Sequence, residues 1–577
     1  MRQVIECVPN FSEGRNKEVI NQIVKAIEAA SVSSGGQEER VKVLDVDPGE
    51  ATNRTVVTFV GSPAAVLQAA FEGVRKAAEV IDMRQHHGAH PRSGACDVLP
   101  LVPVAGITLE ECAELARGLA KRIYEELGIP TYCYEAAALR PERKNLAVCR
   151  AGEYEALPQK IADPDKAPDF GPKEYNETVA KSGATNVGAR NFLIAVNYNL
   201  NSTSTRKANA IAFDVREKGR KKREGGSLTG KVLKDADGKD IWEPGTLKGC
   251  KAIGWFIEEY GIAQVSMNIT DISQTPLHIA YDEVSRAAAA RGLRVTGAEI
   301  VGLMPKQALL QAGRYYLGKQ HRSKGISEEE ILKIAVKSMS LDDLKPFEPK
   351  EKLIECLMED EAEMAEKEKL ARMSLKALAA ETASESPAPG GGSIAAAMGA
   401  LGAALATMVA NLSADKRGWD ARWEEFSLIA EQGQSLVKEL LALVDEDTAA
   451  FGRIMAALGL PKGTEAEKAE RAQALEAATL YATQVPLRTM ETAFKVFALA
   501  KEMAENGNPN SVSDAGVGAI AARGAVMGAL LNVKINAAGL ADRAKAGELA
   551  AKAEQLAAKA GELEAEILGI CSRKIEA

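Results

Sequence analysis

Three of the 5 histidines in the chain stand within nine residues, His86-His87-Gly88-Ala89-His90-Pro91-Arg92-Ser93-Gly94. An imidazole titrates near pH ~6.5, so it can take up or release a proton at the pH of a cell. Pro91 favours an extended backbone at His90, and the nearby glycines let the main chain approach a ligand. We therefore predict that His90 acts as a general acid and base.

Two other interpretations of this stretch stay open. It can be a solvated surface loop that happens to be rich in histidine. It can also bind a metal, because His86 and His90 have the i, i+4 spacing of ligands on a helix. Gly88 and Pro91 are expected to break such a helix, and no Cys or carboxylate stands at ligand spacing beside it. We therefore predict no metal.

A second polar group lies on the two sides of one predicted turn. Asp45 and Asp47 stand two apart at the end of a predicted strand, so they face the same side of it. Arg54 follows the turn, and its guanidinium, like that of Arg92, has the shape to clamp a carboxylate. The alternatives are turn chemistry for the aspartates and surface solvation for the arginines.

A third candidate, Asp447, belongs to a helical stretch near the middle of the C-terminal half. Helical spacing puts it on one face with Leu443, Val444 and Phe451. A carboxylate on an apolar stripe is costly unless it is paired or functional, and burial raises its pKa. Asp445 is less clearly on the inner side and fits a surface residue.

Further polar residues of this half could contact a ligand. Gly391-Gly392-Ser393 begins an apolar helix, where free N–H groups can bind an anion or simply start the helix. Asp514 stands in a stretch, 511–514, that also fits a plain helix cap. Asn532 and Asn536 are i, i+4 neighbours in an apolar helix and need partners, either backbone groups or a ligand.

Two segments of the N-terminal half share the same predicted order of strands and helices, and they must position the histidine stretch and the polar residues beside it. Strand patterns and helical patterns alternate as β-α-β-β-α-β between residues 4 and 104, and again between residues 192 and 301. The fold class predicted for this half is α+β, with two ferredoxin-like subdomains and a groove between them for a ligand. Residues 163–190 are rich in Pro and Gly and predict a connector or a binding loop.

After Ser374, alanine and leucine dominate and strand signals vanish, which predicts an all-α helical-bundle domain. The run 394–412 is long enough to cross a membrane, but Ala and Gly dominate it, so we predict a buried helix and no membrane span. A heptad seam in the last helix indicates packing along another helix or subunit, and we expect a homo-oligomer. It consists of Leu549, Leu556, Leu563 and Ile570, with Ala553, Ala560 and Ile567 between them.

The domain boundaries predicted from these patterns are 1–188, 189–338, a linker 339–373, and 374–577. Composition supports an ordinary globular protein, with 46% hydrophobic and 26% charged residues among 577. The net charge of −8 argues against a nucleic-acid partner. The 8 Cys form no C-x-x-C, and the first residues enter a strand pattern without a signal peptide, so we predict a cytoplasmic enzyme.

Several long motifs together resemble the formimidoyltransferase-cyclodeaminase family. They are Ile5-Glu6-Cys7-Val8-Pro9-Asn10-Phe11-Ser12-Glu13-Gly14, Leu44-Asp45-Val46-Asp47, Thr52-Asn53-Arg54-Thr55, His90-Pro91-Arg92, Ala151-Gly152-Glu153-Tyr154-Glu155-Ala156-Leu157-Pro158 and Ala388-Pro389-Gly390-Gly391-Gly392-Ser393. The likeness covers nearly the whole chain. It departs from the animal members in an insertion at 220–248 and in a charged stretch at 359–372.

The resemblance implies transfer of a formimino group between N-formimino-L-glutamate and tetrahydrofolate, and then cyclisation of 5-formiminotetrahydrofolate to 5,10-methenyltetrahydrofolate with loss of ammonia. It implies His90 as the transferase acid/base, Asp47 as its assisting carboxylate and Asp447 as the cyclodeaminase acid/base. The segment Gly171 to Gly183 and Asp214-Val215-Arg216 match folate-contacting stretches. Tetrahydrofolate is then a substrate, expected in polyglutamylated form.

The expected substrate-binding residues are Arg54, Arg92, Gly171, Pro172, Gly183, Asp214, Val215, Arg216, Gly391, Gly392, Ser393, Asp514, Asn532 and Asn536. Two alternatives stay open: a transferase alone, whose helical half holds subunits together, and a non-catalytic folate-binding scaffold.

Overall fold

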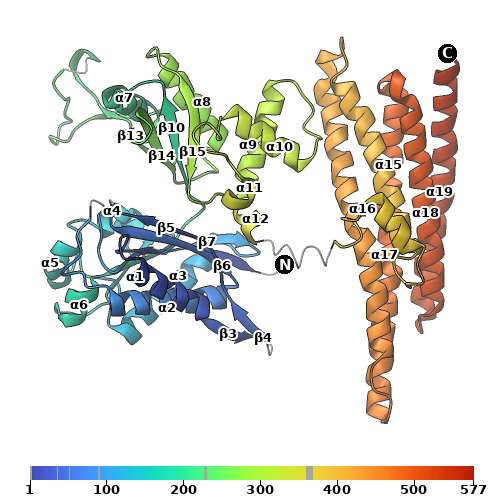
Figure 1. Cartoon of the computed structure of the whole chain (residues 1–577), viewed down its shortest axis with the longest axis horizontal. Helices are drawn as coiled ribbons and strands as arrows, with labels where there is room; N and C mark the ends of the chain where they lie inside the picture. Colours follow the sequence, from blue (N-terminus) through green and yellow to red (C-terminus); the bar gives the residue numbers. More distant parts are fainter. Residues whose placement is uncertain (1–2, 35–36, 51, 89–90, 227–229, 359–367) are drawn as a thin grey trace. The chain divides into compact units, whose positions relative to one another are not determined.

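The computed structural model describes residues 3–34, 37–50, 52–88, 91–226, 230–358 and 368–577. Its contacts divide the chain into two compact units, Met1–Leu309 with Met339–Met358, and Leu310–Ser338 with Glu359–Ala577. The first unit combines sheets with helices and the second consists of long packed helices (Figure 1), so the predicted fold class is confirmed. The predicted domain boundaries stay a prediction.

The first ferredoxin-like arrangement follows the predicted order. It consists of β1 (Val4–Cys7), α1 (Lys17–Ala29), β5 (Lys42–Gly49), β6 (Arg54–Gly61), α2 (Pro63–Val80) and β7 (Cys96–Ala105). The strands are antiparallel, with β5 beside β6, β6 beside β1, and β1 beside β7. Helix α1 begins at Lys17 after an Asn16 cap, because the short strand β2 (Asn10–Phe11) first continues the sheet.

Two more strands extend this sheet beyond β7. Strand β9 (Thr185–Ala189) pairs in parallel with both β7 and β8 (Thr131–Glu135). All five residues of β9 are buried, and α3 (Leu109–Leu127) packs on it. The prediction of a connector over residues 163–190 is therefore wrong at its end, because a short strand of small residues carries little periodic signal.

The pairing register gives this sheet two different faces. Ile5, Cys7 and Phe59 lie in the core that the sheet shares with α1, α2 and α3. Residues directly opposite one another on paired strands share a face. Asp45 lies opposite Thr58, and Asp47 lies opposite Val56, so the two aspartates share the face turned away from these helices. The predicted common side of Asp45 and Asp47 is confirmed.

The second arrangement repeats the order β-α-β-β-α-β, as predicted. It consists of β10 (Ile194–Leu200), α7 (Thr205–Val215), β13 (Cys250–Ile257), β14 (Ile262–Ile269), α8 (Leu277–Ala289) and β15 (Val295–Val301). The strand order is β13-β14-β10-β15. The insertion before β13 contains a small antiparallel pair, β11 (Arg220–Lys221) with β12 (Trp242–Glu243).

Short elements complete the first unit. They are β3 (Ser31–Ser34), β4 (Gln37–Arg40), α4 (Leu146–Cys149), α5 (Leu157–Ala162), α6 (Glu177–Ser182), α11 (Pro349–Lys352) and α12 (Ile354–Met358). Helix α9 (Lys306–Lys319) crosses the boundary between the two units.

The second unit is built around one central apolar helix. Its helices are α10 (Glu328–Ser338), α14 (Leu375–Thr382), α15 (Gly391–Ala414), α16 (Trp423–Leu458), α17 (Glu465–Asn506), α18 (Val512–Ala538) and α19 (Arg543–Glu576). Helix α15 packs against α16, α17 and α18. The backbones of α15 and α18 meet closely at Gly402 and Gly518, where a Cβ would come within about 3 Å of the opposite backbone. Small residues therefore permit this packing.

Two features predicted for this half can be compared with the structure. The heptad seam of α19 packs on α17 and α18 of the same chain, so the predicted packing along another helix is confirmed. Packing along another subunit stays a prediction. Two helices, Gly391–Ala414 and Pro509–Ala538, are long and apolar enough to cross a membrane by length and composition. More than half of the most apolar window of the first is buried within the bundle, as in a core helix.

Candidate functional sites

Asn53 joins three separate stretches of the first unit. Its Oδ1 accepts a hydrogen bond from the Gly14 backbone N–H (3.0 Å), and its Nδ2 donates to the His87 carbonyl (3.0 Å). Its own carbonyl accepts a hydrogen bond from His86 Nε2 (2.8 Å). The residue has a φ of 49°, which asparagine tolerates better than most side chains. The turn before β6 therefore holds His86 and His87 in place.

The histidine stretch is buried at His86 and exposed at His87. Burial lowers the pKa of His86 below its ordinary value, and the Asn53 carbonyl opposes that shift. Because Nε2 faces a carbonyl, it carries the proton, while Nδ1 finds no hydrogen-bond partner among the described residues. His86 thus has a structural role, because its ring is buried and held by the Asn53 carbonyl. His90, the predicted acid/base, lies outside the described residues.

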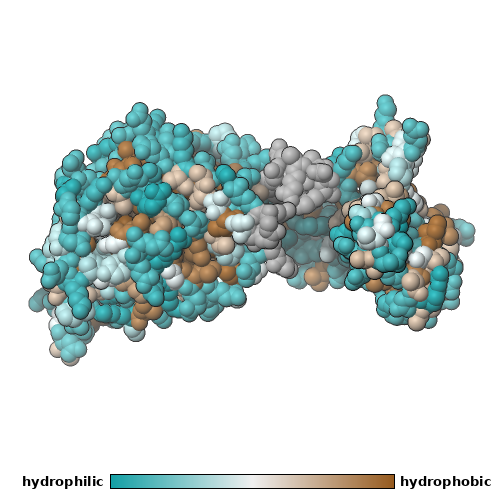
Figure 2. Space-filling model, turned by 90° about the horizontal axis from the view of Figure 1, so that it is seen from below, coloured by the Kyte–Doolittle hydropathy of each residue, from teal (hydrophilic) through white to brown (hydrophobic). Residues whose placement is uncertain are grey.

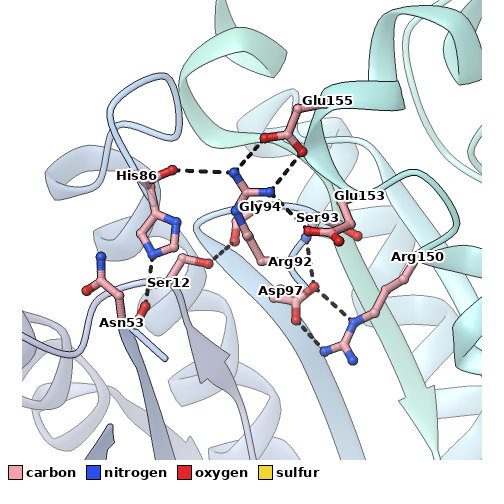
Figure 3. A network of polar contacts seen from close by, with 10 residues as sticks. All are labelled: Ser12, Asn53, His86, Arg92, Ser93, Gly94, Asp97, Arg150, Glu153 and Glu155. Carbon is pink, nitrogen blue, oxygen red and sulfur yellow. Dashed lines mark hydrogen bonds and ion pairs between the residues drawn. The ribbon is translucent and has the colours of Figure 1, made fainter. Parts of the chain in front are cut away.

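Arg92 is the most tightly held side chain of the stretch (Figure 3). Its guanidinium contacts Glu155 twice, at 2.8 and 2.6 Å, and Glu153 once, at 3.1 Å. The Arg92 side chain is only 9% exposed. The predicted clamp for a substrate carboxylate is therefore occupied by carboxylates of the chain itself.

The face of the sheet that is turned away from α1, α2 and α3 carries the other predicted residues. Asn10 Oδ1 accepts a hydrogen bond from Arg54 Nε (2.9 Å), and Asn10 and Asp47 both lie opposite Val56, one on either side of β6. Burial lowers the pKa of Arg54 to about 10. Burial, and then the charge of Asp47, raises the pKa of Asp45. Asp47 is exposed.

The predicted folate stretch Gly171 to Gly183 meets the histidine stretch at its end. Gly183 has a φ of 68° and bridges to Gly94, and a Cβ there would come within 2.3 Å of the Ser93 carbonyl oxygen. Glycine is therefore required for this contact. Gly171 packs against Pro168 and Pro130 and, like Pro172, is only partly exposed.

The side chains of the second predicted folate stretch, residues 214–216, have their partners within their own subdomain. Asp214 pairs with Arg220 and Arg291, and Val215 is fully buried. Arg216 donates from Nε to the Gly219 carbonyl (3.0 Å) and from Nη1 to the Ala252 carbonyl (3.3 Å). Among the described residues, none of these three side chains makes a hydrogen bond or an ion pair with residues 86–88 or 91–94.

Asp447 lies where the first turn of α15 meets α16. Ser393 Oγ donates to Asp447 Oδ2 (3.2 Å), and Ser393 Oγ and Thr448 Oγ1 are 3.1 Å apart. A Cβ on Gly392 would come within 2.2 Å of Asp447 Oδ1, so the carboxylate rests directly on the glycine backbone. Burial raises the pKa of Asp447, and hydrogen bonds from the side chain and backbone of Ser393 oppose that shift. The half-buried carboxyl of Asp447 therefore gives up its proton less readily than an exposed aspartate does.

The remaining predicted ligands of the helical unit divide into two groups. Asn532 lies beside Gly391 and donates to the Gly528 carbonyl, and Asn536 donates to the Ala482 carbonyl of α17. Asp514 lies in the first turn of α18, about 27 Å along the axis from Asn532 at a rise of about 1.5 Å per residue. Asp514 and Asp447 therefore cannot serve one site within a single chain. Ser511 does end the segment before α18, but its side chain makes no capping hydrogen bond.

Sequence reasoning missed several residues that hold these sites. Asp445, expected at the surface, accepts hydrogen bonds from the Leu370 and Ala371 N–H groups. Glu446 binds Tyr481 and Arg488 of α17. The Asp97–Arg150 ion pair of the first unit also went unpredicted. The signal in the sequence that could have indicated the contacts of Asp445 and Glu446 is the run of three acidic residues, Asp445-Glu446-Asp447.

In the described part of the chain, no three or more His, Cys, Asp and Glu side chains are grouped so that they could hold a metal ion.

Comparison with known proteins covers both units. Family models match over residues 4–190 (formiminotransferase domain, N-terminal subdomain), 195–359 (formiminotransferase domain) and 374–555 (formiminotransferase-cyclodeaminase). The formimidoyltransferase-cyclodeaminase of Rattus norvegicus is 42% identical over 94% of each chain. The glutamate formimidoyltransferase of Thermoplasma acidophilum is 41% identical over 57% of this chain and 96% of its own.

A third relative extends the chemistry. The methenyltetrahydrofolate cyclohydrolase of Methylorubrum extorquens is 43% identical over 29% of this chain and 80% of its own. These matches define a bifunctional enzyme of folate metabolism, with a transferase part and a cyclodeaminase part. The chain belongs to the formimidoyltransferase-cyclodeaminase family.

Proposed function

We propose that the first unit transfers a formimino group between N-formimino-L-glutamate and tetrahydrofolate, and that the second unit cyclises 5-formiminotetrahydrofolate to 5,10-methenyltetrahydrofolate. The observation that carries the second activity is the half-buried carboxyl of Asp447 against the first turn of α15. His90 is the proposed transferase acid/base and Asp47 its assisting carboxylate.

The transfer step needs one group that moves protons and one that stabilises positive charge. The incoming amine loses a proton when it attacks the amidinium carbon, and the leaving nitrogen gains one, which an imidazole at residue 90 can do in turn. The tetrahedral adduct carries positive charge, which the exposed carboxylate of Asp47 would stabilise. The Asn10–Arg54 pair lies on the same face and would orient the substrate.

Cyclisation needs a proton for the departing ammonia. The second folate nitrogen attacks the formimino carbon, a C–N bond forms, and the C–N bond to the amino group breaks once that group is protonated. Asp447 in its acid form can give this proton, and its carboxylate can then take the proton of the attacking nitrogen. Ser393 and Thr448 would hold the carboxyl in place.

The form of the folate and the assembly belong to the same proposal. A polyglutamylated folate carries extra carboxylates, which the exposed cations Lys218, just before the insertion, and Lys222, within it, would bind. We also propose a cytoplasmic homo-oligomer. Helices α15 and α18 expose large apolar side chains at heptad-like spacing, and Figure 2 shows apolar atoms on the surface of this unit. They are Leu401, Met408, Leu412, Val517, Ile520, Met527, Leu531 and Ile535.

Two substitutions test the separation of the activities. His90→Ala should abolish transfer and leave cyclisation of added 5-formiminotetrahydrofolate intact, and Asp447→Ala should do the reverse. Methenyl absorbance and ammonia release measure the two steps. Glu424→Ala, an exposed carboxylate at the start of α16, is the matched control.

Three outcomes would contradict the proposal. Loss of both activities in one folded variant would overturn the assignment of separate sites. Transfer without ammonia release by the unmodified protein would favour a transferase with a structural helical half. Folate binding without turnover would favour a scaffold.

A further inference from the structure

We propose that the indole of Trp255 is a stacking platform for the pterin ring of tetrahydrofolate, and that Asn197 binds the polar edge of that ring. Both residues belong to the four-stranded sheet β13-β14-β10-β15, in the part of the chain that the formiminotransferase model matches (Figure 1). The inference rests on the proposed function and deepens it, because it names residues that bind one of the two transferase substrates.

The first observation is the side of the sheet on which Trp255 lies. Strand β13 alternates, with Ala252 and Gly254 buried and Ile253 and Trp255 exposed. A Cβ on Gly254 would come within 2.2 Å of the Asn209 backbone nitrogen in α7, so the buried side of β13 meets this helix. Ile253 and Trp255 lie on the opposite side and are 52% and 39% exposed. Two large apolar side chains exposed next to each other form a surface that a flat ring can cover.

The second observation is that hydrogen bonds hold the exposed indole in one orientation. Trp255 Nε1 donates to Gln264 Oε1 (3.1 Å), and Gln264 Nε2 donates to Asn199 Oδ1 (2.8 Å). Asn199 Nδ2 donates to Asp343 Oδ2 (3.2 Å). A carboxylate only accepts, so Asp343 determines which way both amides point. Gln264 and Asn199 are fully buried, and a ring fixed in this way loses little freedom when a ligand stacks on it.

The third observation is an almost buried amide on the same side of the sheet. Asn197 stands two residues before Asn199 on β10, so the two side chains share a face. It is 7% exposed, and its side chain makes no hydrogen bond with any described residue. Burying an amide without a partner is costly, and a ligand with donors and acceptors along its edge would satisfy it.

The pairing register connects the amide with the apolar surface. Asn197 stands opposite Ser266 of β14, and Ser266 stands opposite Ile253 of β13, so the three side chains form one row across the sheet. Neighbouring strands are about 4.8 Å apart, so Asn197 lies roughly 10 Å across the sheet from β13. A bicyclic ring on the indole, together with the side chains at its two ends, can span this distance.

The pterin is the part of tetrahydrofolate that uses both features. Its pyrimidine ring is flat and carries an amino group, ring nitrogens and a carbonyl along its edge. The benzoyl ring has no such edge, and the glutamate tail requires cations. An aromatic surface with a few fixed polar groups is the usual composition of a site for a ligand of this kind.

This side of the sheet adjoins the proposed folate stretch 214–216. The Glu217 backbone N–H donates to the Cys250 carbonyl (3.2 Å), and Arg216 Nη1 donates to the Ala252 carbonyl (3.3 Å). The stretch therefore ends against the first residues of β13, the strand that carries Trp255.

The same side also lies within range of charges on the first sheet. Lys251 alternates with Ala252 along β13 and so shares the exposed side with Trp255. Burial raises the pKa of Glu135, at the end of β8, and the charge of Lys251 opposes that shift. A ring on Trp255 would therefore lie on the side of the second sheet that approaches the first sheet.

The experiment measures KM for tetrahydrofolate in the transferase reaction of the full chain. Trp255→Ala removes the platform, and we expect this KM to rise about tenfold while KM for formiminoglutamate stays unchanged. Trp255→Phe keeps an aromatic ring and should raise it by less than about threefold. Phe256→Ala is the matched control, because this aromatic is 41% exposed and strand alternation turns it to the other side of β13.

Two further variants separate the binding amide from the residues that orient the indole. Asn197→Ala should raise KM for tetrahydrofolate about fivefold, because hydrogen bonds to the ring are lost. Gln264→Met keeps the volume but frees the indole, so this KM should rise by a smaller factor than in Trp255→Ala. Cyclisation of added 5-formiminotetrahydrofolate should be unchanged in all of these variants.

Tryptophan emission gives a second readout that does not depend on turnover. The chain has 4 Trp, and 5-formyltetrahydrofolate, added as a probe, should quench their emission. The quench should be smaller in Trp255→Phe than in the unmodified protein, because a ring stacked on the indole accounts for part of it. An equal quench in the two proteins would contradict the stacking.

Other kinetic results overturn the inference. An unchanged KM for tetrahydrofolate in Trp255→Ala, or an equal rise in Phe256→Ala, would show that the indole is no platform. A rise in KM for formiminoglutamate instead would assign this surface to the other substrate. If Gln264→Met lowered only the melting temperature, Gln264 would be structural. If the unmodified protein transferred no formimino group, the proposed function would fail, whereas a quench that depends on Trp255 would still support the binding surface.

Discussion

The two proposed sites of this enzyme hold their polar groups in place by different means. In the first unit, side chains from distant stretches reach across loops: Asn53 binds Gly14 and His87, and Glu155 binds Arg92. In the second unit, the proposed site lies at the start of a helix, where the Gly392 backbone contacts the Asp447 carboxyl directly. Loops need such cross-links because their backbone has no repeating hydrogen-bond pattern, whereas a helix start has a defined geometry of its own.

This difference predicts opposite sensitivities. The loop site should depend on polar side chains and tolerate small changes of backbone volume away from them. The helical site should depend on the absence of a side chain at one position and on the protonation of one carboxyl.

The largest effect is expected for Gly392→Ala. The added methyl group would overlap the Asp447 carboxyl, so the carboxyl must move, and we expect cyclodeaminase activity to fall about 100-fold with transfer unchanged. Gly547→Ala in α19, where no atom lies within 4 Å of the added Cβ, should leave both activities intact. Equal cyclodeaminase activity in Gly392→Ala and Gly547→Ala would show that the Gly392 backbone does not position the Asp447 carboxyl.

Asn53→Ala tests the side-chain half. It removes hydrogen bonds to Gly14 and His87, which should cost roughly 2 kcal/mol of unfolding free energy at about 1 kcal/mol each, and it should lower transfer but not cyclisation. Asn53→Gly keeps the positive φ without strain. The loss of stability and of transfer in this variant therefore measures the contribution of the Asn53 amide alone. Urea unfolding and the two assays measure the effects. An unchanged transfer rate would show that this cross-link does not matter for function.

Asp447→Asn should separate stability from activity in the helical unit. Burial raises the pKa of Asp447, so the folded state prefers the protonated form and ionisation destabilises it as pH rises past the ordinary value. The amide should therefore melt higher than the unmodified protein at pH 7, and the gain should vanish in acid, while cyclisation is lost. A lower melting temperature at pH 7 would indicate that the ionised carboxylate stabilises the fold.

The smallest effect is expected for His86→Gln. The pKa of His86 is lowered in the folded state, so unfolding takes up a proton and the first unit loses stability as pH falls below about 6.5. Gln can still donate to the Asn53 carbonyl but does not titrate. The variant should match the unmodified protein at pH 8 and exceed it near pH 5, as measured by thermal melting. Parallel pH curves would rule out His86 as the cause.

Local patterns carried much of the architecture. The alternation of strand residues placed Asp45 and Asp47 on one face, and helical spacing placed Asp447 on an apolar stripe, because side-chain direction along a strand or helix follows from backbone geometry. The repeated β-α-β-β-α-β order and the change to helices after residue 374 were visible for the same reason. Strand β9 was not, because five small residues show no clear period.

The partners of the polar groups were decided only when the elements packed. From the sequence, Arg92 could equally be a clamp for a substrate or a surface residue. Its partner Glu155 stands 63 residues later in the chain and meets it only in the folded structure. Asp514, Asn532 and Asp447 look like one set of ligands until α18 is seen to separate the first two by about 27 Å at about 1.5 Å per residue. Periodicity depends on neighbours along the chain, whereas an ion pair depends on which distant surfaces meet, and no local pattern encodes that.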